Sequence, residues 1–122
     1  EDIARGRSYV VLEAGKVVGT FVFFVGHEPV YDVITNGAWH AEKPYGVIHR
    51  VASDGVTRGV GRASFDYCAS QADYLRIDTH EKNRPMQQAL ERYGFQRCGG
   101  VTYEPGKERI GFDYVENKMR AH

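Results

Sequence analysis

The alternation of apolar and polar residues divides the first part of the chain into two strands. Strand-like runs cover residues 9–12 and 17–25, and the second run is rich in valine and phenylalanine. A tight turn over residues 13–16 separates them. This spacing predicts a β-hairpin, and Gly19 is the expected position of a bulge in it.

The middle of the chain changes from a strand pattern to a helix pattern and back. Residues 46–52 form an apolar run, a polar loop follows, and residues 59–72 carry apolar side chains at helical spacing. Residues 74–78 are again strand-like. A strand, a helix and a strand in succession predict a parallel pair joined by a right-handed crossover.

The last part of the chain predicts a second helix and a closing hairpin. Pro85 is allowed in the first turn of a helix, and Gly94 is suited to end it. Residues 95–103 and 109–115 alternate like two strands around a turn. The remaining residues, 116–122, are a polar tail.

Residues 27–45 show no sustained period but contain three large aromatic residues, Tyr31, Trp39 and Tyr45. Loops of this length are uncommon in compact domains and tend to be functional or disordered. One interpretation is an ordered loop that lines a pocket, which makes Tyr31 and Trp39 candidate substrate-binding residues. The other is that the rings pack against the sheet.

Composition restricts the class of protein. A chain of 122 residues, 42% hydrophobic and 26% charged, predicts one domain over residues 1–115 followed by the tail. Sixteen basic residues balance sixteen acidic ones, so neither a nucleic-acid nor a membrane partner is expected. With no apolar run or leader of the membrane type, a cytoplasmic protein is expected.

Residues 1–7 resemble a helix end, which a missing N-terminal piece would explain.

The two cysteines do not suggest a metal site. Cys68 lies in a helical stretch and Cys98 in a strand-like one, without the paired spacing of a metal or redox motif. They are expected to be small buried hydrophobic residues. We therefore predict no metal and no disulfide.

The turn before the first helix has the features of an anion-binding site. Gly59 and Gly61 allow close approach of the backbone, and the first amides of a helix have no partner within it. Arg58 and Arg62 flank the turn and add positive charge. An ordinary strand-loop-helix connection is the alternative.

Two nucleotide-binding motifs do not fit this turn. Asp78 lies at about the distance expected for the ribose-binding acid of a dinucleotide fold, but Ser64 occupies the third glycine position. Residues 53–58 also separate the strand from the first glycine. A Walker-type loop is excluded because no Gly-Lys-Ser/Thr follows.

Several motifs follow one another in order along the chain. Val51-Ala52-Ser53 is followed by a loop and by Arg58-Gly59-Val60-Gly61-Arg62-Ala63. Residues 75–80, 83–86 and 93–95 then lead to the last hairpin. This combination resembles the GNAT superfamily of acetyl-CoA-dependent N-acetyltransferases, and the first two segments resemble its acyl-CoA pyrophosphate motif.

The resemblance implies an α/β (α+β) fold. Its sheet is mixed and mostly antiparallel, has helices on both faces, and contains a central parallel strand pair that splays apart to hold acyl-CoA. The strand and one or two helices that precede the first hairpin in the family are absent here.

The resemblance also implies the cofactor site, with acetyl-CoA as cosubstrate. Val51 and Ser53 would pair through their backbones with the pantetheine arm, and Asn83 would contact that arm or the nearby phosphate. Val56 stands where the family usually has Gln or Arg. The backbone amides that would bind the pyrophosphate are those of Arg58, Gly59, Val60, Gly61, Arg62 and Ala63.

The implied reaction is direct attack of a primary amine on the thioester. His49 is the first candidate for the base, with a hydrogen-bonded core histidine as the alternative. Tyr45 either relays a proton or packs. In the family a tyrosine of the second helix often protonates the leaving thiolate; that position here is Leu90, so Tyr93, a turn later, is the candidate acid.

The acceptor is left open by the sequence. Asp78 and His80, near the end of a predicted strand, either serve the acceptor or form a local cap. The balanced charge disfavours a polycationic acceptor. A non-catalytic acyl-CoA-binding module is the alternative function, and the exposed edge of the last hairpin makes a homodimer a hypothesis.

Overall fold

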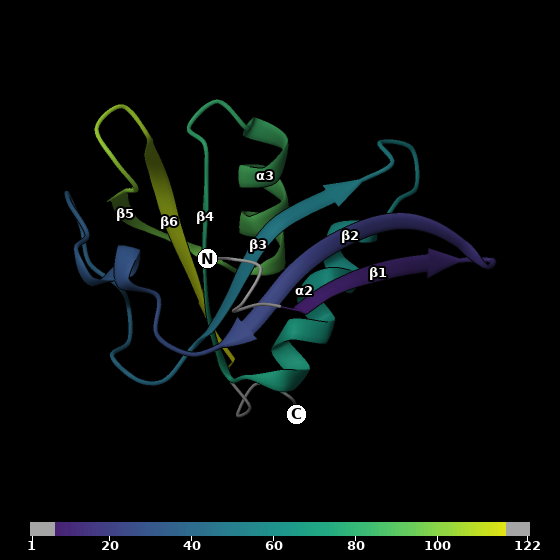
Figure 1. The fold of residues 1–122 in the computed structure, drawn as a ribbon, viewed down its shortest axis with the longest axis horizontal. Coiled ribbons are helices and arrows are strands. Elements are labelled where there is room, and N and C mark those ends of the chain that lie inside the picture. Colours follow the sequence, from purple (N-terminus) through teal and green to yellow (C-terminus); the bar gives the residue numbers. More distant parts are fainter. Residues whose placement is uncertain (1–6, 117–122) are drawn as a thin grey trace.

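The computed structural model describes residues 7–116. The predicted helix end before residue 7 and the predicted tail from residue 117 onward lie outside the described residues. Within them the chain forms one six-stranded sheet and two α-helices (Figure 1). The elements in chain order are β1 (Arg7–Glu13), β2 (Lys16–Val25), the 3-10 helix η1 (Pro29–Asp32), β3 (Gly46–Ser53), α2 (Val60–Gln71), β4 (Tyr74–Thr79), α3 (Arg84–Tyr93), β5 (Gln96–Thr102) and β6 (Glu108–Val115).

The sheet has the predicted mixed topology. Its strand order is β1-β2-β3-β4-β6-β5. Only β3 and β4 are parallel, and α2 is the crossover between them, whereas the other neighbours are antiparallel. The fold class is therefore confirmed, and the two hairpins begin and end within a few residues of their predicted positions.

The two α-helices differ from the prediction because both pack on the same face of the sheet. Their buried side chains join one core with the inward residues of the strands. Among residues 7–116, the segment that covers the opposite face is the loop between β2 and β3, with η1 inside it. The expectation of helices on both faces is corrected accordingly. The buried residues of this helix-side core are Phe21, Phe23, Ile48, Phe65, Cys68, Leu75, Ile77, Leu90, Phe95 and Phe112.

The aromatic loop covers the other face with a second core. Tyr31, Trp39 and Tyr45 are all buried there, and Trp39 Nε1 donates a hydrogen bond of 2.9 Å to the Tyr31 carbonyl. The strands contribute the remaining buried members of this loop-side core, which are Val47, Tyr74, Cys98 and Val101. Of the two sequence interpretations, the structure favours packing for these three rings.

Gly19 places α2 close to the sheet. A Cβ atom at this position would lie 2.3 Å from Val60 Cγ1 and 3.0 Å from the Ala52 carbonyl oxygen, so no larger residue fits. The register shift of the hairpin lies at Val18, one residue before the predicted bulge position. Gly19 is therefore needed for packing rather than for the bulge itself.

The outer edge of the last hairpin is β5. Part of that edge is already used, because Thr35 of the long loop forms a bridge with Gly100 through hydrogen bonds of 2.8 and 2.9 Å. The homodimer stays a hypothesis.

The described part of the chain contains no helix with the length and apolar content needed to cross a membrane.

Candidate functional site

The parallel strands β3 and β4 stop pairing halfway along their length. Their last paired residues are Ile48 and Ile77, although β3 runs on to Ser53 and β4 to Thr79. Figure 1 shows β3 bending away from β4 beyond this point. The splay expected from the family resemblance is therefore present.

A β-bulge explains the bend of β3. The register between β2 and β3 shifts there, and Arg50 adopts a left-handed φ of 56°. An extra residue in one strand bends it and increases its twist. Beyond Ile48, the edge of β3 that faces β4 has no strand partner among residues 7–116. Val51 and Ser53, the residues predicted to contact pantetheine, lie in this segment.

The start of α2 offers unpaired backbone amides. Gly59 precedes the helix with a φ of 83°, and no side chain caps the first turn. The Ala63 amide donates to the Gly59 carbonyl at 2.9 Å. The amides of Val60, Gly61 and Arg62 have no hydrogen-bond partner within the described residues. Free N–H groups at the positive end of a helix dipole suit an anion.

The loop before α2 is held in shape by Asp54. Its carboxylate accepts hydrogen bonds from the amides of Val56 and Thr57 at 3.0 and 2.8 Å, and from Thr57 Oγ1 at 2.7 Å. These bonds, with that from the Thr57 hydroxyl the largest contribution, lower the pKa of Asp54. The turn that presents the free amides is therefore ordered by its own side chains.

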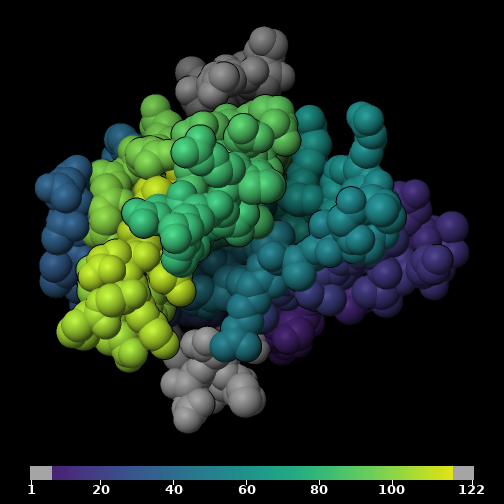
Figure 2. All heavy atoms as spheres, turned by 90° about the horizontal axis from the view of Figure 1, so that it is seen from above, coloured from purple at the N-terminus to yellow at the C-terminus, as the bar shows by residue number. Residues whose placement is uncertain are grey.

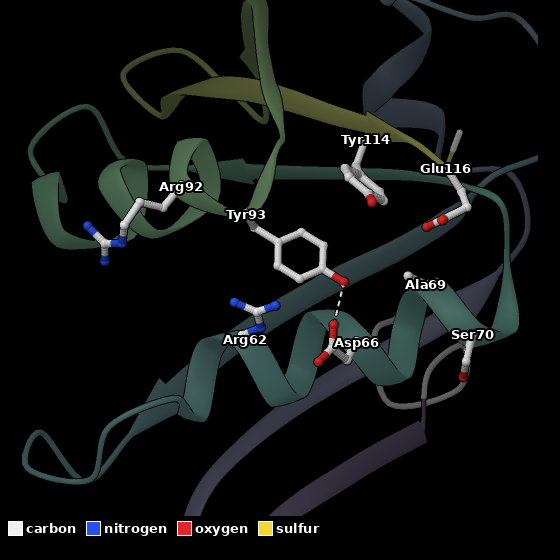
Figure 3. Close-up of a pocket in the computed structure, with 8 residues that line it drawn as sticks. All are labelled: Arg62, Asp66, Ala69, Ser70, Arg92, Tyr93, Tyr114 and Glu116. Carbon is white, nitrogen blue, oxygen red and sulfur yellow. Dashed lines mark hydrogen bonds between the residues drawn. The ribbon is translucent and has the colours of Figure 1, made fainter. Parts of the chain in front are cut away.

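A groove separates α2 from α3 on the helix side of the sheet. At the start of α2 it encloses about 290 Å³ and includes Gly59 and Gly61. A wider hollow of about 730 Å³ continues toward the other end of α2, and Arg62, Arg92 and Tyr93 border both parts (Figure 3). This groove has the positive side chains that a phosphate-bearing ligand requires.

Tyr93 lies in this groove and not beside His49. Its hydroxyl donates a hydrogen bond of 2.7 Å to Asp66 Oδ1 on α2, drawn as the dashed line in Figure 3. Burial raises the pKa of Tyr93, and the bond to the Asp66 carboxylate raises it further. The structure therefore does not bring the candidate acid and the candidate base into one hollow.

The opposite face of the sheet holds a separate cavity of about 540 Å³. It lies where β3 and β4 diverge, next to the β5–β6 turn. Figure 2 looks onto this end of the molecule, with the yellow β5–β6 hairpin and the teal segment after β3 on opposite sides. The residues that line the cavity are Glu28, Pro29, Val30, His49, Arg50, Asp78, Tyr103, Glu104, Lys107 and Arg109.

Asp78 is fixed at the wall of this cavity by two tyrosines. The hydroxyls of Tyr31 and Tyr103 each donate a hydrogen bond of 2.7 Å to Asp78 Oδ2. The pKa of Tyr31 is raised by its burial and by the neighbouring Asp78 carboxylate. Tyr31 is only 1% exposed. Because the Tyr31 ring is buried and does not line the cavity, its contribution is to orient Asp78.

His49 faces the same cavity together with an acid that the sequence did not single out. His49 Nε2 is buried, has no hydrogen-bond partner within the described residues, and lies 3.6 Å from Glu28 Oε1. The Glu28 amide donates a hydrogen bond of 2.9 Å to the Tyr45 hydroxyl. Tyr45 thus anchors the segment that carries Glu28. A single glutamate in an aperiodic loop gives no sequence signal of this contact.

A buried polar network lies under the loop. The guanidinium of Arg76 stacks 4.3 Å from the ring centres of both Trp39 and Tyr45, and its Nε donates to the Tyr74 hydroxyl at 3.1 Å. That hydroxyl donates in turn to Asp113 at 2.8 Å. Trp39 therefore packs against Arg76 and does not line the cavity.

Two further predicted residues lie outside the cavity. His80 is exposed, and its Nδ1 accepts a hydrogen bond of 3.0 Å from the Lys82 amide, as in a local cap. Asn83 is the N-cap of α3, and its Oδ1 accepts from the Met86 amide at 3.2 Å. Both side chains thus have local structural partners at the start of α3.

One group of side chains has the composition of a metal site. The ligand atoms of His40, Cys98 and Asp113 all lie within 4.8 Å of one another. Asp113 already accepts hydrogen bonds from the His40 amide and ring at 2.7 and 2.8 Å. Burial, and after it the neighbouring Asp113, raise the pKa of the Cys98 thiol. Protein partners therefore account for this cluster.

Comparison with known proteins identifies the family. No protein-family model and no curated protein matches the sequence. Among solved structures, a GNAT-family acetyltransferase from Streptococcus agalactiae is 33% identical and superposes with a TM-score of 0.79 over 91% of this chain and 66% of its own. The chain described here belongs to the GNAT superfamily.

More distant structures share the fold. A GNAT-family acetyltransferase from Bacillus cereus is 19% identical, with a TM-score of 0.66 over 92% of this chain and 72% of its own. A ribosomal-protein-S5-alanine acetyltransferase from Vibrio fischeri is 14% identical, with a TM-score of 0.64 over 95% of this chain and 64% of its own. The chain thus spans 66% and 64% of the lengths of the Streptococcus and Vibrio proteins.

Proposed function

We propose that this protein transfers an acetyl group from acetyl-CoA to a primary amine. The observation that carries the proposal is the position of His49 and Asp78. Each is the first residue beyond the last pair of the splayed strands, after Ile48 and Ile77, and both line the same cavity. The free amides of α2 lie on the other side of the sheet. Acetyl-CoA bound to these amides could place its thioester in the gap between the strands, where the acceptor amine would approach it from the cavity.

The acetyl-CoA side of the site is proposed to use mainly the backbone. The free amides of Val60, Gly61 and Arg62 would bind the pyrophosphate, with the side chains of Arg62 and Arg58 adding charge. The unpaired edge of β3 at Val51 and Ser53 would hydrogen-bond the pantetheine arm. These roles need no large rearrangement, because the amides already lack partners within residues 7–116.

The reaction would proceed by direct attack. The amine nitrogen forms a bond to the thioester carbonyl carbon, the carbon–sulfur bond breaks, and the electron pair leaves on sulfur. The amine loses one proton and the leaving thiolate gains one, so the reaction consumes no further reactant. A backbone amide such as that of Val51 would stabilise the developing oxyanion without reorganisation.

His49 is proposed as the base that takes the proton from the amine. Its Nε2 is the one buried side-chain nitrogen or oxygen without a hydrogen-bond partner within the described residues, and Glu28 Oε1 lies 3.6 Å away. An amine in the cavity could therefore pass its proton to Nε2 without the loss of an existing hydrogen bond.

A non-catalytic acyl-CoA-binding module is the second candidate. It is favoured by one observation: the tyrosine predicted to protonate the thiolate is bonded to Asp66 in the helix-side groove. Such a module would bind acetyl-CoA through the same amides and release no thiol when amines are added. The two functions therefore differ in turnover and not in cosubstrate binding.

The test measures acetyl-CoA binding and thiol release with a panel of primary amines. We expect wild-type protein to do both, and His49→Gln to bind acetyl-CoA normally while its kcat falls by about 100-fold or more. His27→Gln is the matched control, since His27 is exposed and bonded to Asp32. Binding without thiol release by the wild type would favour the second candidate, and an unchanged kcat in His49→Gln would remove His49 as the base.

A further inference from the structure

The cavity on the loop side carries charges of both signs. Among its lining residues, Glu28 and Arg50 are engaged with other groups of the protein. Lys107 and Glu104 pair with each other at 3.5 Å on the exposed β5–β6 turn. Asp78 and Arg109 are left, and neither forms an ion pair within the described residues.

Asp78 has a free carboxylate oxygen. Its Oδ2 accepts the two tyrosine hydroxyls, while Oδ1 receives no hydrogen bond from residues 7–116. Tyr31 and Tyr103 are neutral donors, so the negative charge of Asp78 is oriented without being balanced by a cation. An oriented, unbalanced carboxylate at a cavity wall suits a positively charged group of a ligand.

Arg109 is the complementary group. Its Nη1 donates to the Glu108 carbonyl at 3.2 Å, and no carboxylate of the described residues pairs with it. The guanidinium has five donors in a planar arrangement that matches a carboxylate or a phosphate. A half-buried arginine without an acidic partner is therefore suited to bind an anion.

The two charges lie on the same face of neighbouring strands. Asp78 pairs with Gly111 in the β4–β6 ladder, and Arg109 lies two residues along β6 from Gly111. Side chains two apart in a strand share a face, and such diagonal neighbours have Cβ atoms roughly 7 Å apart. Yet no ion pair joins Asp78 to Arg109. A small molecule with charges at both ends would fit between them.

We propose that the acceptor carries an anionic group, a carboxylate or a phosphate, in addition to its amine. Asp78 holds the amine as its ammonium form before transfer, and Arg109 binds the anionic group. This inference rests on the proposed acetyl transfer. A polycation would be repelled by Arg109, and an amine without an anion would leave Arg109 unpaired. The cavity of about 540 Å³ suits a small molecule of this kind.

The experiment compares acceptors with and without the negative charge, and the carboxylate and carboxamide of each pair are also equal in size. Glycine, β-alanine and 4-aminobutyrate are each paired with the corresponding carboxamide, and O-phosphoethanolamine is paired with ethanolamine. Spermidine is the polycationic comparison. A charge-assisted hydrogen bond predicts a kcat/KM at least about 10-fold higher for the anionic member of the best pair. The series with the higher kcat/KM, carboxylate or phosphate, identifies the anionic group of the acceptor.

Arg109→Gln tests the assigned residue. We expect kcat/KM for the anionic acceptor to fall by about 10-fold or more, to the level of its neutral counterpart, while that of the neutral acceptor is unchanged. Arg97→Gln is the control, because Arg97 lies near Glu91 and the ring of Phe112, outside the cavity. Acetyl-CoA affinity should be equal in both variants and the wild type.

The outcomes separate this inference from the proposed function. Equal or better turnover of carboxamides, simple amines or spermidine would overturn the inference and leave acetyl transfer in place. If no amine is acetylated, the proposed function fails, and calorimetric titration of the same acceptors with the CoA-bound protein still decides the inference. If the anionic acceptors bind and Arg109→Gln abolishes their binding, the inference is supported. If they do not bind, both the inference and the proposed function are overturned.

Discussion

The two faces of the sheet are stabilised in different ways. On the helix side, α2 and α3 bury an apolar core to which residues 7–116 contribute no buried charged side chain. On the loop side, the buried charged residues of the described chain, Glu28, Arg76 and Asp113, lie among aromatic rings. The helix side therefore acts as a scaffold that presents backbone amides. The loop side holds oriented side chains, and such side chains are what acid–base chemistry and acceptor recognition require.

The two faces also differ in how the backbone polar groups of the segments that cover them are hydrogen-bonded. Helices satisfy their own backbone hydrogen bonds, so the helix side needs only apolar contacts. A loop cannot do this, and its polar groups find partners in the sheet. The His40 amide bonds to Asp113, and the Ala41 carbonyl accepts from Arg76 at 2.8 Å. The Tyr74 hydroxyl lies 3.0 Å from the same carbonyl and 2.8 Å from Asp113, and its one proton serves either acceptor. The buried charges thus fix the loop that carries Glu28.

The largest effect is expected from the polar network of the loop side. Asp113→Ala removes the acceptor of the His40 amide and ring and the buried carboxylate that the Tyr74 hydroxyl contacts next to Arg76. We expect a loss of about 3–5 kcal/mol in the free energy of unfolding, measured by urea denaturation. Asp73→Ala, at an exposed aspartate, is the control. A loss below about 1 kcal/mol for Asp113→Ala would mean that the network is dispensable.

A core substitution on the helix side should cost somewhat less and leave acceptor recognition intact. Leu90 is fully buried in the helix-side core. Leu90→Ala is expected to lower the free energy of unfolding by about 2–5 kcal/mol through lost burial and a cavity. The exposed Leu12 gives the matched control, Leu12→Ala. If the folded Leu90→Ala protein showed a changed KM for the acceptor, the separation between the two faces would be incomplete.

Gly61 is expected to matter for binding and not for folding. A Cβ atom there would meet only Phe65 Cε2 at 3.8 Å, and alanine is preferred over glycine in a helix. Gly61→Ala should therefore stabilise the fold by up to about 1 kcal/mol while weakening acetyl-CoA binding by about 10-fold. Both quantities follow from thermal unfolding with and without acetyl-CoA.

The control for Gly61 is a glycine far from the proposed site. Gly15→Ala should have the opposite pattern, because Gly15 has a φ of 79° in the first hairpin turn. It should lose about 1–2 kcal/mol of stability without a change in affinity. Unchanged affinity in Gly61→Ala would contradict the amide site at the start of α2.

The smallest effect concerns the two thiols, one on each face. Burial raises the pKa of Cys68 to about 12 and also raises that of Cys98. Neither thiol should react with iodoacetamide in the folded protein at pH 8, as intact mass would show. In moderate urea Cys98 should react before Cys68, because only the loop covers it. The reverse order would show that the helices open first.

The same thiols predict a pH dependence of stability. Between pH 9 and 12 an unfolded thiol loses its proton, while Cys68 in the folded state retains it up to about pH 12. Its contribution to stability is therefore complete below pH 9 and is lost as the pH rises through this window. Cys68→Ala should flatten the corresponding part of the stability curve, measured by urea denaturation at successive pH values.

The sequence alone determined the order of the elements and the nature of the turn before α2. Strand and helix periods are local properties, and glycine, proline and asparagine mark element ends locally, so Gly59, Pro85 and Gly94 lie where predicted. The sequence placed His49 on the central strand and Asp78 at the end of the next one, but only the structure shows that both line one cavity.

Only the tertiary structure decided which side chains complete the cavity. Residues 27–45 have no period, so nothing local indicated that Tyr31 would hold Asp78 or that Glu28 would approach His49. The direction of Tyr93 was also undetermined, since its partner Asp66 comes from another helix. These contacts depend on which face of the sheet each segment covers. That choice is made by the packing of distant parts of the chain, which no local pattern records.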